Sequence, residues 1–146
     1  MPVVSGEILE GGPVVDLLIG VSGPRKEKLE NVGLPVPQRV RVRAVIDTGS
    51  ALTGIRPDAL ALLGIDPLDE ITIATPSTWG TRALAFRYHV SLSLPGEQVE
   101  MHFEEALVLG APFHQSEGIQ ALIGRDILEE CLFVYDGVRR LFSLGF

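Results

Sequence analysis

An Asp-Thr-Gly-Ser turn at the end of an apolar run, in residues 45–51 (VIDTGSA), is the most informative element of this sequence. The run predicts a strand that enters the core just before Asp47, whose carboxylate is then a candidate general acid or base. Burying a carboxylate is costly unless it is hydrogen-bonded; Gly49 and Ser50 can supply backbone N–H groups, and Thr48 and Ser50 add hydroxyls. A surface β-turn, in which Asp, Thr and Gly are all ordinary residues, is an equally good interpretation of the triplet alone.

A second pattern, in residues 121–128 (ALIGRDIL), repeats the order of an apolar strand, a glycine and a short helix. The two patterns together resemble the aspartic proteases, in which an Asp-Thr-Gly turn is followed by a strand ending in two apolar residues and Gly. Residues 122–126 are most similar to the retroviral proteases, with their Gly-Arg-Asn or Gly-Arg-Asp continuation. Residues 133–136 and 141–143 are similar to the terminal hairpin of pepsin lobes. The resemblance covers residues 39–146.

The resemblance implies a homodimer, because pepsin-type chains carry two Asp-Thr-Gly turns and this shorter chain carries one. Asp47 of each subunit would meet its counterpart across a two-fold axis. Two carboxylates in contact cannot both ionise, so they would share one proton. The ionised one would act as general base on a bound water, and the protonated one would hydrogen-bond the scissile carbonyl. The implied activity is hydrolysis of peptide bonds, with no cofactor and no metal.

Roles for the residues beside Asp47 also follow from the resemblance. Thr48 matches the residue that bonds its symmetry mate beneath the two carboxylates, and Ser50 matches the one that bonds the outer carboxylate oxygen. The implied catalytic residues are Asp47, Thr48 and Gly49.

Arg125 matches an arginine that braces the active-site loop of the family through an acidic residue. The matching loop here, residues 50–52, contains no acid. The partner of Arg125 is therefore left open, with Asp126 as one alternative.

A hairpin of residues 71–94 matches the family's flap, which covers bound peptide and excludes water. Its tip is expected at residues 76–80 and holds Trp79, the single tryptophan. Trp79 is expected either to pack onto substrate or to be tucked against its own domain. For Leu122, which matches a residue of the substrate pocket, a role in the core is the alternative. The residues expected to contact substrate lie in the turn, the flap tip and the strand before Gly124: Ser50, Ala51, Trp79, Gly80, Gln120 and Leu122.

Short β-branched runs and strict alternation of apolar residues predict a mainly β chain. Residues 22–38, which are polar and contain Pro and Gly, are predicted to form a long loop. Short helices are predicted over residues 57–64 and 125–131. The predicted strands are residues 14–21, 39–46, 51–55, 71–75, 83–94, 99–103, 106–109 and 119–124, with a final hairpin of 132–135 and 139–144.

The length of 146 residues, 46% of them hydrophobic, fits a single domain, residues 1–146. With the resemblance, the elements predict a closed retropepsin-like (acid protease) barrel with a flap hairpin and one or two short helices. The net charge of −7 would repel a phosphate backbone, so no nucleic-acid partner is expected. Six of the twelve basic residues nevertheless fall within residues 25–43, which is interpreted as a solvated loop and strand face.

The cysteine and histidine content and the hydropathy of the sequence give expectations for cellular location and metal binding. One cysteine, Cys131, is interpreted as a structural thiol and favours a reducing compartment. No membrane span or basic leader is present, so a cytoplasmic protein with no membrane partner is expected. The positive mean hydropathy of +0.29 suggests a self-association surface. His89, His102 and His114 are too scattered to predict a metal site.

Three hypotheses for function remain open at this point. The first is a homodimeric aspartic endopeptidase, favoured by the intact turn and its intact partner strand. The second is a module of the same fold that dimerises or binds peptide without turnover, favoured by the glycine-poor flap tip and the missing acid. The third is an unrelated β-barrel with a chance Asp-Thr-Gly triplet.

Overall fold

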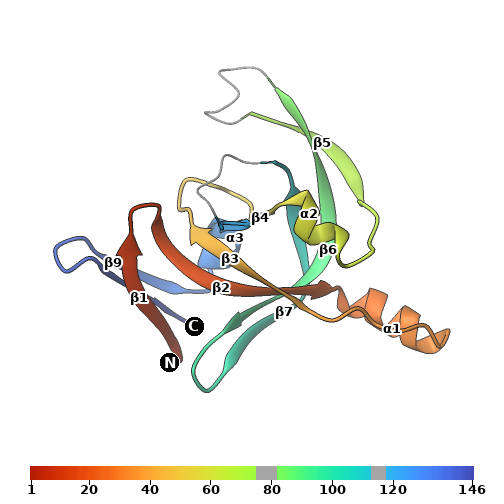
Figure 1. Ribbon diagram of the computed structural model, residues 1–146, viewed down its shortest axis with the longest axis horizontal. Helices are drawn as coiled ribbons and strands as arrows, with labels where there is room; N and C mark the ends of the chain where they lie inside the picture. The colour runs from red at the N-terminus through yellow and green to blue at the C-terminus, as the bar shows by residue number, and fades with distance from the viewer. Residues whose placement is uncertain (75–81, 113–117) are drawn as a thin grey trace.

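Strands make up most of the described chain, which in this computed structural model comprises residues 1–74, 82–112 and 118–146 (Figure 1). The strands are β1 (Val3–Leu9), β2 (Gly12–Val21), β3 (Val40–Ile46), β4 (Gly54–Ile55), β5 (Asp69–Ile73), β6 (Ala83–Pro95), β7 (Glu100–Gly110), β8 (Ala121–Ile123), β9 (Leu132–Asp136) and β10 (Leu141–Gly145). The helices are α1 (Gly23–Asn31), α2 (Pro57–Ala61) and α3 (Arg125–Leu128). The mainly β prediction is confirmed, with a third helix beyond the one or two expected.

Six strands of the described chain close into a barrel. The sheet order is β5-β6-β7-β4-β8-β3-β2-β1-β10-β9, and an additional pairing between β2 and β6 joins the ring. That pairing is antiparallel and places Leu18 opposite Ser93. The ring therefore consists of β2, β3, β8, β4, β7 and β6, as predicted for a closed barrel.

Alternate residues of β2 and β3 fill the barrel interior, as the two-residue period of a strand requires. The inward residues, none more than 6% exposed, are Val15, Leu17 and Ile19 of β2 and Val42, Ala44 and Ile46 of β3. Each fully buried Val, Leu or Ile side chain of this set stabilises the folded state by about 1.5–3 kcal/mol relative to an exposed one. The alternation carries Ile46 into the core immediately before Asp47, as the sequence predicts.

A smaller sheet of β1, β10 and β9 lies beside the barrel, at the left of Figure 1. β1 pairs antiparallel with β10 so that Val3 lies opposite Gly145, and β9 pairs with the other edge of β10. The N–H of Phe146 donates to the carbonyl of Pro2 (3.0 Å), so the two ends of the chain meet. The sequence predicts the C-terminal hairpin but misses β1, because only Ile8 of that strand is buried.

The prediction of a loop over residues 22–38 is wrong, since its first half forms α1. Ser22 caps the helix: its hydroxyl accepts a hydrogen bond from the backbone N–H of Arg25 (3.4 Å), and a proline occupies the first turn. Only Leu29 of the helix is buried. The helix therefore lacks the apolar stripe by which periodicity detects helices.

Other boundaries differ less. β7 is one strand rather than the two predicted at 99–103 and 106–109, because it pairs with β6 on both sides of a β-bulge at Glu104 and Glu105. α3 ends at Leu128, short of the predicted residue 131. β5 and β6 form the predicted hairpin, and its expected tip lies outside the described residues.

Candidate active site

The Asp-Thr-Gly turn begins where β3 leaves the sheet. The backbone N–H of Asp47 donates to the carbonyl of Ile123 (2.9 Å), which extends the parallel pairing of β3 with β8 by one residue. The N–H of Gly49 donates to Oδ1 of Asp47 (2.9 Å), and the N–H of Ser50 donates to the Asp47 carbonyl (3.2 Å). The turn thus fixes the carboxylate through its own backbone, as the sequence predicts for Gly49.

The carboxylate lies near the surface rather than in the interior. Asp47 is half-buried, while Thr48 and Gly49 are exposed. The hydroxyl of Ser50 donates to the carbonyl of Leu52 (2.7 Å) and not to the carboxylate, which differs from the role implied by the resemblance. In the single chain, one face of the turn is open to solvent or to another molecule.

Gly124 allows the second pattern to pass directly beneath the turn. A Cβ at this position would lie 2.6 Å from the carbonyl carbon and oxygen of Leu52 and 3.0 Å from the carbonyl oxygen of Ser50. Real Cβ atoms do not approach backbone so closely, so only glycine fits here. The next two residues donate hydrogen bonds to backbone carbonyls of the loop after Asp47. The N–H of Arg125 donates to the Ser50 carbonyl (2.8 Å), and that of Asp126 donates to the Ala51 carbonyl (3.3 Å).

Arg125 finds its partner in the backbone of the turn itself. Its Nη1 donates to the carbonyl of Thr48 (2.9 Å). The alternative partner, Asp126, is instead engaged by Thr53. A backbone carbonyl thus takes the place of the acidic side chain that the loop lacks.

Thr53 is a site residue that the sequence analysis missed. It is fully buried; its Oγ1 donates to Oδ1 of Asp126 (2.8 Å) and accepts from the N–H of Gly124 (3.1 Å), and its own N–H donates to Oδ2 of Asp126 (3.0 Å). These bonds tie the end of the Asp47 loop to the segment that carries Arg125. A hydroxyl residue inside the predicted apolar strand 51–55 was the signal available in the sequence.

Replacing Thr53 by Val should lower the free energy of unfolding by about 1–3 kcal/mol, because the buried N–H of Gly124 and the Asp126 carboxylate each lose a partner while the side-chain shape is kept. Urea denaturation measures the change. Thr72→Val, at an exposed threonine of β5, is the matched control and should change stability by less than about 0.5 kcal/mol. Equal effects of the two substitutions would contradict this role of Thr53.

The expected substrate-contacting residues fall into three groups. Leu122 and Gln120 alternate with the fully buried Ala121 and Ile123, so both face away from the core. Leu122 lies opposite Val45, two residues before Asp47 and therefore on the same face of β3 as the carboxylate.

Ala51 is exposed in the loop after the turn. Trp79 and Gly80 lie outside the described residues. The structure thus brings the turn and β8 together, and it leaves the two flap-tip predictions without a described position.

An ion pair holds the base of the β5–β6 hairpin. Nε of Arg87 donates to Oδ1 of Asp69 (2.6 Å), and its Nη2 bonds the other carboxylate oxygen. The hydrogen bond from Arg87 lowers the pKa of Asp69 from its ordinary value, and raises the pKa of Arg87 in turn. A depressed aspartate pKa means that the pair is fully charged above about pH 3.9 and is lost only as the pH falls through the lowered value.

Cys131 lies away from the turn. It is half-buried; its Sγ donates to the carbonyl of Ile127 (3.4 Å), and burial raises the pKa of its thiol. A raised pKa disfavours the reactive thiolate, in line with the structural thiol expected from the sequence.

The described part of the chain offers neither a membrane-spanning helix nor a cluster of metal ligands. Within residues 1–74, 82–112 and 118–146, no helix is long and apolar enough to cross a membrane. Over the same residues, no group of three or more His, Cys, Asp or Glu side chains is arranged to hold a metal ion. His89 and His102 each lie beside a glutamate, Glu105 and Glu100, and His114 lies outside the described residues.

No family model and no curated protein matches this sequence. Among solved structures, the chain is similar to a retropepsin-like aspartic protease from Rickettsia conorii, with a TM-score of 0.61 and 14% sequence identity. The match covers 99% of this chain and 90% of that one. The likeness shows that the closed, mainly β barrel has the retropepsin-like fold predicted from the two sequence patterns.

Proposed function

We propose that this chain is an aspartic endopeptidase whose active site forms between two copies, with Asp47 of each meeting at a two-fold axis. The observation that supports it most strongly is the exposed Asp-Thr-Gly turn, tied by Arg125 and Thr53 to the segment after β8 on a retropepsin-like fold. These hydrogen bonds hold the backbone of the turn and of the loop after it, and they do not involve the Asp47 carboxylate.

A second copy is needed because one carboxylate cannot serve as acid and base at once. Among the described residues, the Asp47 carboxylate accepts a hydrogen bond from Gly49, and no other carboxylate is bonded to it. The exposure of Thr48 and Gly49 leaves room for the same turn of a partner. Two such carboxylates in contact share one proton, which supplies the base and the acid together.

Catalysis then proceeds without a covalent intermediate. The ionised Asp47 removes a proton from a water held between the carboxylates, and the water oxygen attacks the peptide carbonyl carbon. The protonated Asp47 donates its hydrogen to the carbonyl oxygen as negative charge develops there. The first Asp47 then passes the proton it took from water to the amine nitrogen as the C–N bond breaks, and the other Asp47 takes back the hydroxyl proton of the tetrahedral intermediate, so that the pair again shares one proton.

Substrate would lie along the face that carries the carboxylates. Leu122, on the face of the sheet shared with Asp47, and the exposed Ala51 are proposed to contact the peptide, together with Gln120 and Ser50. Trp79 and Gly80 are proposed to cover it from the hairpin tip.

The Asp69–Arg87 pair supports this arrangement under acidic conditions. Because the pKa of Asp69 is lowered, the hairpin base keeps its charges at pH values where two carboxylates still share a proton.

A peptide-binding or dimerisation module without turnover is the second candidate. The bond from Ser50 to Leu52 favours it, because the carboxylate then lacks the side-chain donor expected in the enzyme.

Cleavage of a generic peptide library separates the two candidates. The endopeptidase should cut the library with a rate that peaks on the acidic side of neutral, because activity requires one proton on two carboxylates and is lost when that proton is removed. A statine-type inhibitor such as pepstatin should abolish the cleavage. Binding of pepstatin without cleavage would instead support the module, and an insensitive activity that keeps rising from pH 7 to 9 would contradict both.

A further inference from the structure

A cavity of about 370 Å³ lies on the outside of the barrel, between α1, the segment before β3, and strands β2, β6 and β7. We call it the outer cavity. Arg39, which lines it, precedes β3, whereas Asp47 follows that strand, so about 25 Å of chain separates them. Because of this separation, the cavity is distinct from the candidate active site. Its volume is within the range of about 300–1,000 Å³ that is usual for small-molecule sites.

Ser91 forms the floor of the outer cavity. Its side chain lies at a β-bulge between Val90 and Leu92 and is only 7% exposed. Its hydroxyl makes no hydrogen bond within the described chain, and the oxygen is open to the cavity, because every fully buried side-chain oxygen and nitrogen of the described residues has a partner. A Cβ placed on Gly20 would lie 2.7 Å from its Oγ, so the absence of a side chain at Gly20 keeps the space above the hydroxyl open.

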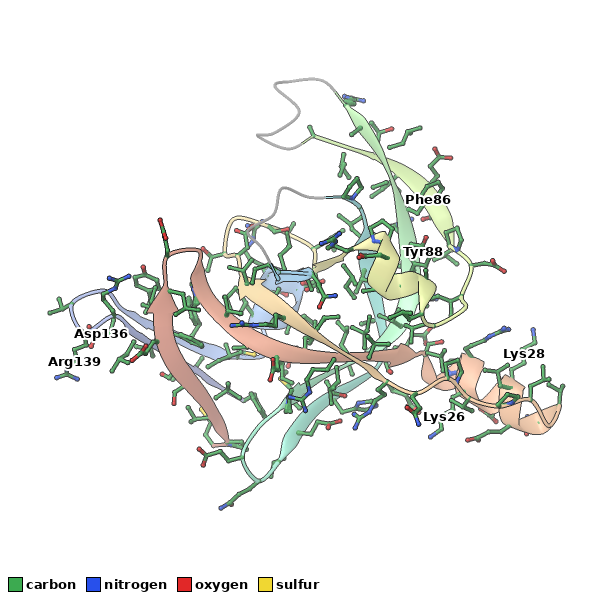
Figure 2. All side chains as sticks on the ribbon, in the orientation of Figure 1. Lys26, Lys28, Phe86, Tyr88, Asp136 and Arg139 are labelled. Atoms are coloured by element: carbon green, nitrogen blue, oxygen red, sulfur yellow. The ribbon has the colours of Figure 1, made fainter. Side chains whose placement is uncertain are left out.

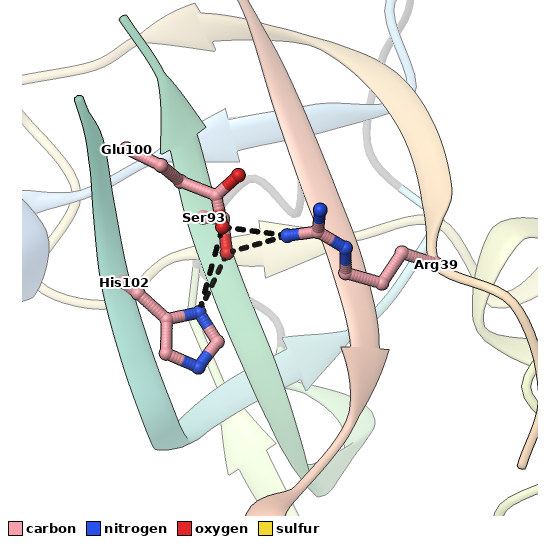
Figure 3. A network of polar contacts seen from close by, with 4 residues as sticks. All are labelled: Arg39, Ser93, Glu100 and His102. Atoms are coloured by element: carbon pink, nitrogen blue, oxygen red, sulfur yellow. Dashed lines mark hydrogen bonds and ion pairs between the residues drawn. The ribbon is translucent and has the colours of Figure 1, made fainter. Parts of the chain in front are cut away.

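Basic side chains surround this floor, and Figure 3 shows how one of them is fixed. Nη1 of Arg39 donates to Oε1 of Glu100 (2.6 Å) and to Oγ of Ser93 (3.3 Å). The same Ser93 oxygen lies 2.7 Å from Nδ1 of His102. These contacts use one guanidinium nitrogen and one ring nitrogen, so the remaining nitrogens of Arg39 and His102 stay available to a ligand.

Lys26 of α1 adds a second permanent positive charge to the outer cavity. It forms no ion pair with another described residue. Lys28 lies on the same helix but does not line the cavity, because residues two apart point to nearly opposite sides of a helix. Figure 2 shows the two lysines on different sides of α1.

Glu104 is the one acidic side chain that lines the outer cavity among the described residues. It packs against Gly23 at the start of α1, where a Cβ would collide with it, and no cation of the described chain lies within ion-pair distance. The Glu104 carboxylate is therefore a hydrogen-bond acceptor beside Lys26 and Arg39. An anion without hydroxyl groups would offer this carboxylate no hydrogen-bond donor.

We propose that the outer cavity binds a small hydroxylated organic anion. Its phosphate or carboxylate group contacts Lys26 and Arg39, and its hydroxyl groups bond Ser91 and Glu104. Cationic donors are the groups that hold such oxyanions in proteins. Two of the six basic residues within positions 25–43 of this acidic chain line the cavity.

Isothermal titration of the full chain with glycerol 3-phosphate, glycerate, inorganic phosphate and glycerol tests the proposal. One of the two hydroxylated anions should bind with a Kd of about 0.1–1 mM, and the tighter of them identifies the acidic group as phosphate or carboxylate. Glycerol, which lacks the anion, should not bind. Inorganic phosphate, which lacks the carbon-bound hydroxyls, should bind about tenfold more weakly than glycerol 3-phosphate.

Matched variants locate the binding. Lys26→Ala should weaken it about tenfold, whereas Lys28→Ala, with the same loss of charge on the same helix, should change it less than twofold. Ser91→Ala should weaken it about threefold or more, with its thermal unfolding compared to wild type to verify folding. Asp47→Asn should bind as wild type, so the result is independent of proteolysis.

Three results would overturn the proposal. The first is that neither glycerol 3-phosphate nor glycerate binds saturably at about 10 mM. The second is that Lys26→Ala and Lys28→Ala weaken the binding equally. The third is that inorganic phosphate binds as tightly as glycerol 3-phosphate.

Discussion

Asp47→Asn should reduce the rate of peptide cleavage by about 10²–10⁴-fold or more, because the amide can neither accept the proton of the attacking water nor carry the shared proton. The fold should survive, since Asn is nearly isosteric and its amide oxygen can still accept the bond from the N–H of Gly49. Initial rates on a peptide identified from the library measure the loss, and circular dichroism verifies the fold. Asp66→Asn, at an exposed carboxylate distant in sequence from the turn, should retain wild-type activity.

The same variant also tests whether two copies build one site. Mixing wild-type chain with a fourfold excess of Asp47→Asn, followed by subunit exchange, leaves only about one fifth of wild-type subunits paired with one another. Activity per wild-type subunit should fall to about that fraction, and sedimentation should show a dimer at the assay concentration. Unchanged activity in the mixture, or cleavage by a strictly monomeric species, would show that a single chain suffices.

Gly124→Ala should lower the free energy of unfolding by about 1–3 kcal/mol or more, because the added methyl group meets the backbone of Leu52 and Ser50, which cannot rotate away. Any relief requires the loop after Asp47 to shift, so the remaining folded protein should also lose most of its activity. Chemical denaturation and rates at matched folded concentration measure the two effects.

Gly137→Ala is the matched control for this substitution. A Cβ at Gly137 has its nearest neighbour, a ring carbon of Tyr135, at an ordinary 3.4 Å, and the backbone there is not left-handed. Its stability should remain within about 0.5 kcal/mol of wild type. A Gly124→Ala variant as stable and active as this control would refute the close crossing of the two segments.

The sequence predicts those features of the site that depend on residue type and local order. Asp47 and Gly49 stand out because an apolar strand ends in residues that build a turn, and Gly124 because the same order recurs. The direct bond of Gly49 to the carboxylate follows from this local chemistry. The mainly β character likewise follows from alternation in successive short strands, whereas the closed barrel was implied by the resemblance that the two patterns carry.

Contacts between distant segments were beyond sequence analysis. The bonds of Thr53 to Gly124 and Asp126 exist only because β4 and β8 pair side by side. A hydroxyl inside a predicted apolar strand marks Thr53 as unusual, but it does not identify these two partners. The partner of Arg125 is a backbone carbonyl, which residue types cannot reveal. α1 was missed for a related reason. Only Leu29 of this helix is buried, so the helix has no apolar pattern, and it is stabilised instead by its N-terminal cap and its proline.

The antiparallel pairing of β1 with β10 determines how the molecule responds to mechanical force. Val3 lies opposite Gly145, so tension applied to the two ends of the chain acts on the last rung of this ladder and loads its hydrogen bonds one at a time. A sheet opened in this way peels at low force, in contrast to strands pulled in shear, where many bonds resist together. The terminal strands would thus yield first under extension, while the barrel that carries Asp47 stays closed by the β2–β6 pairing.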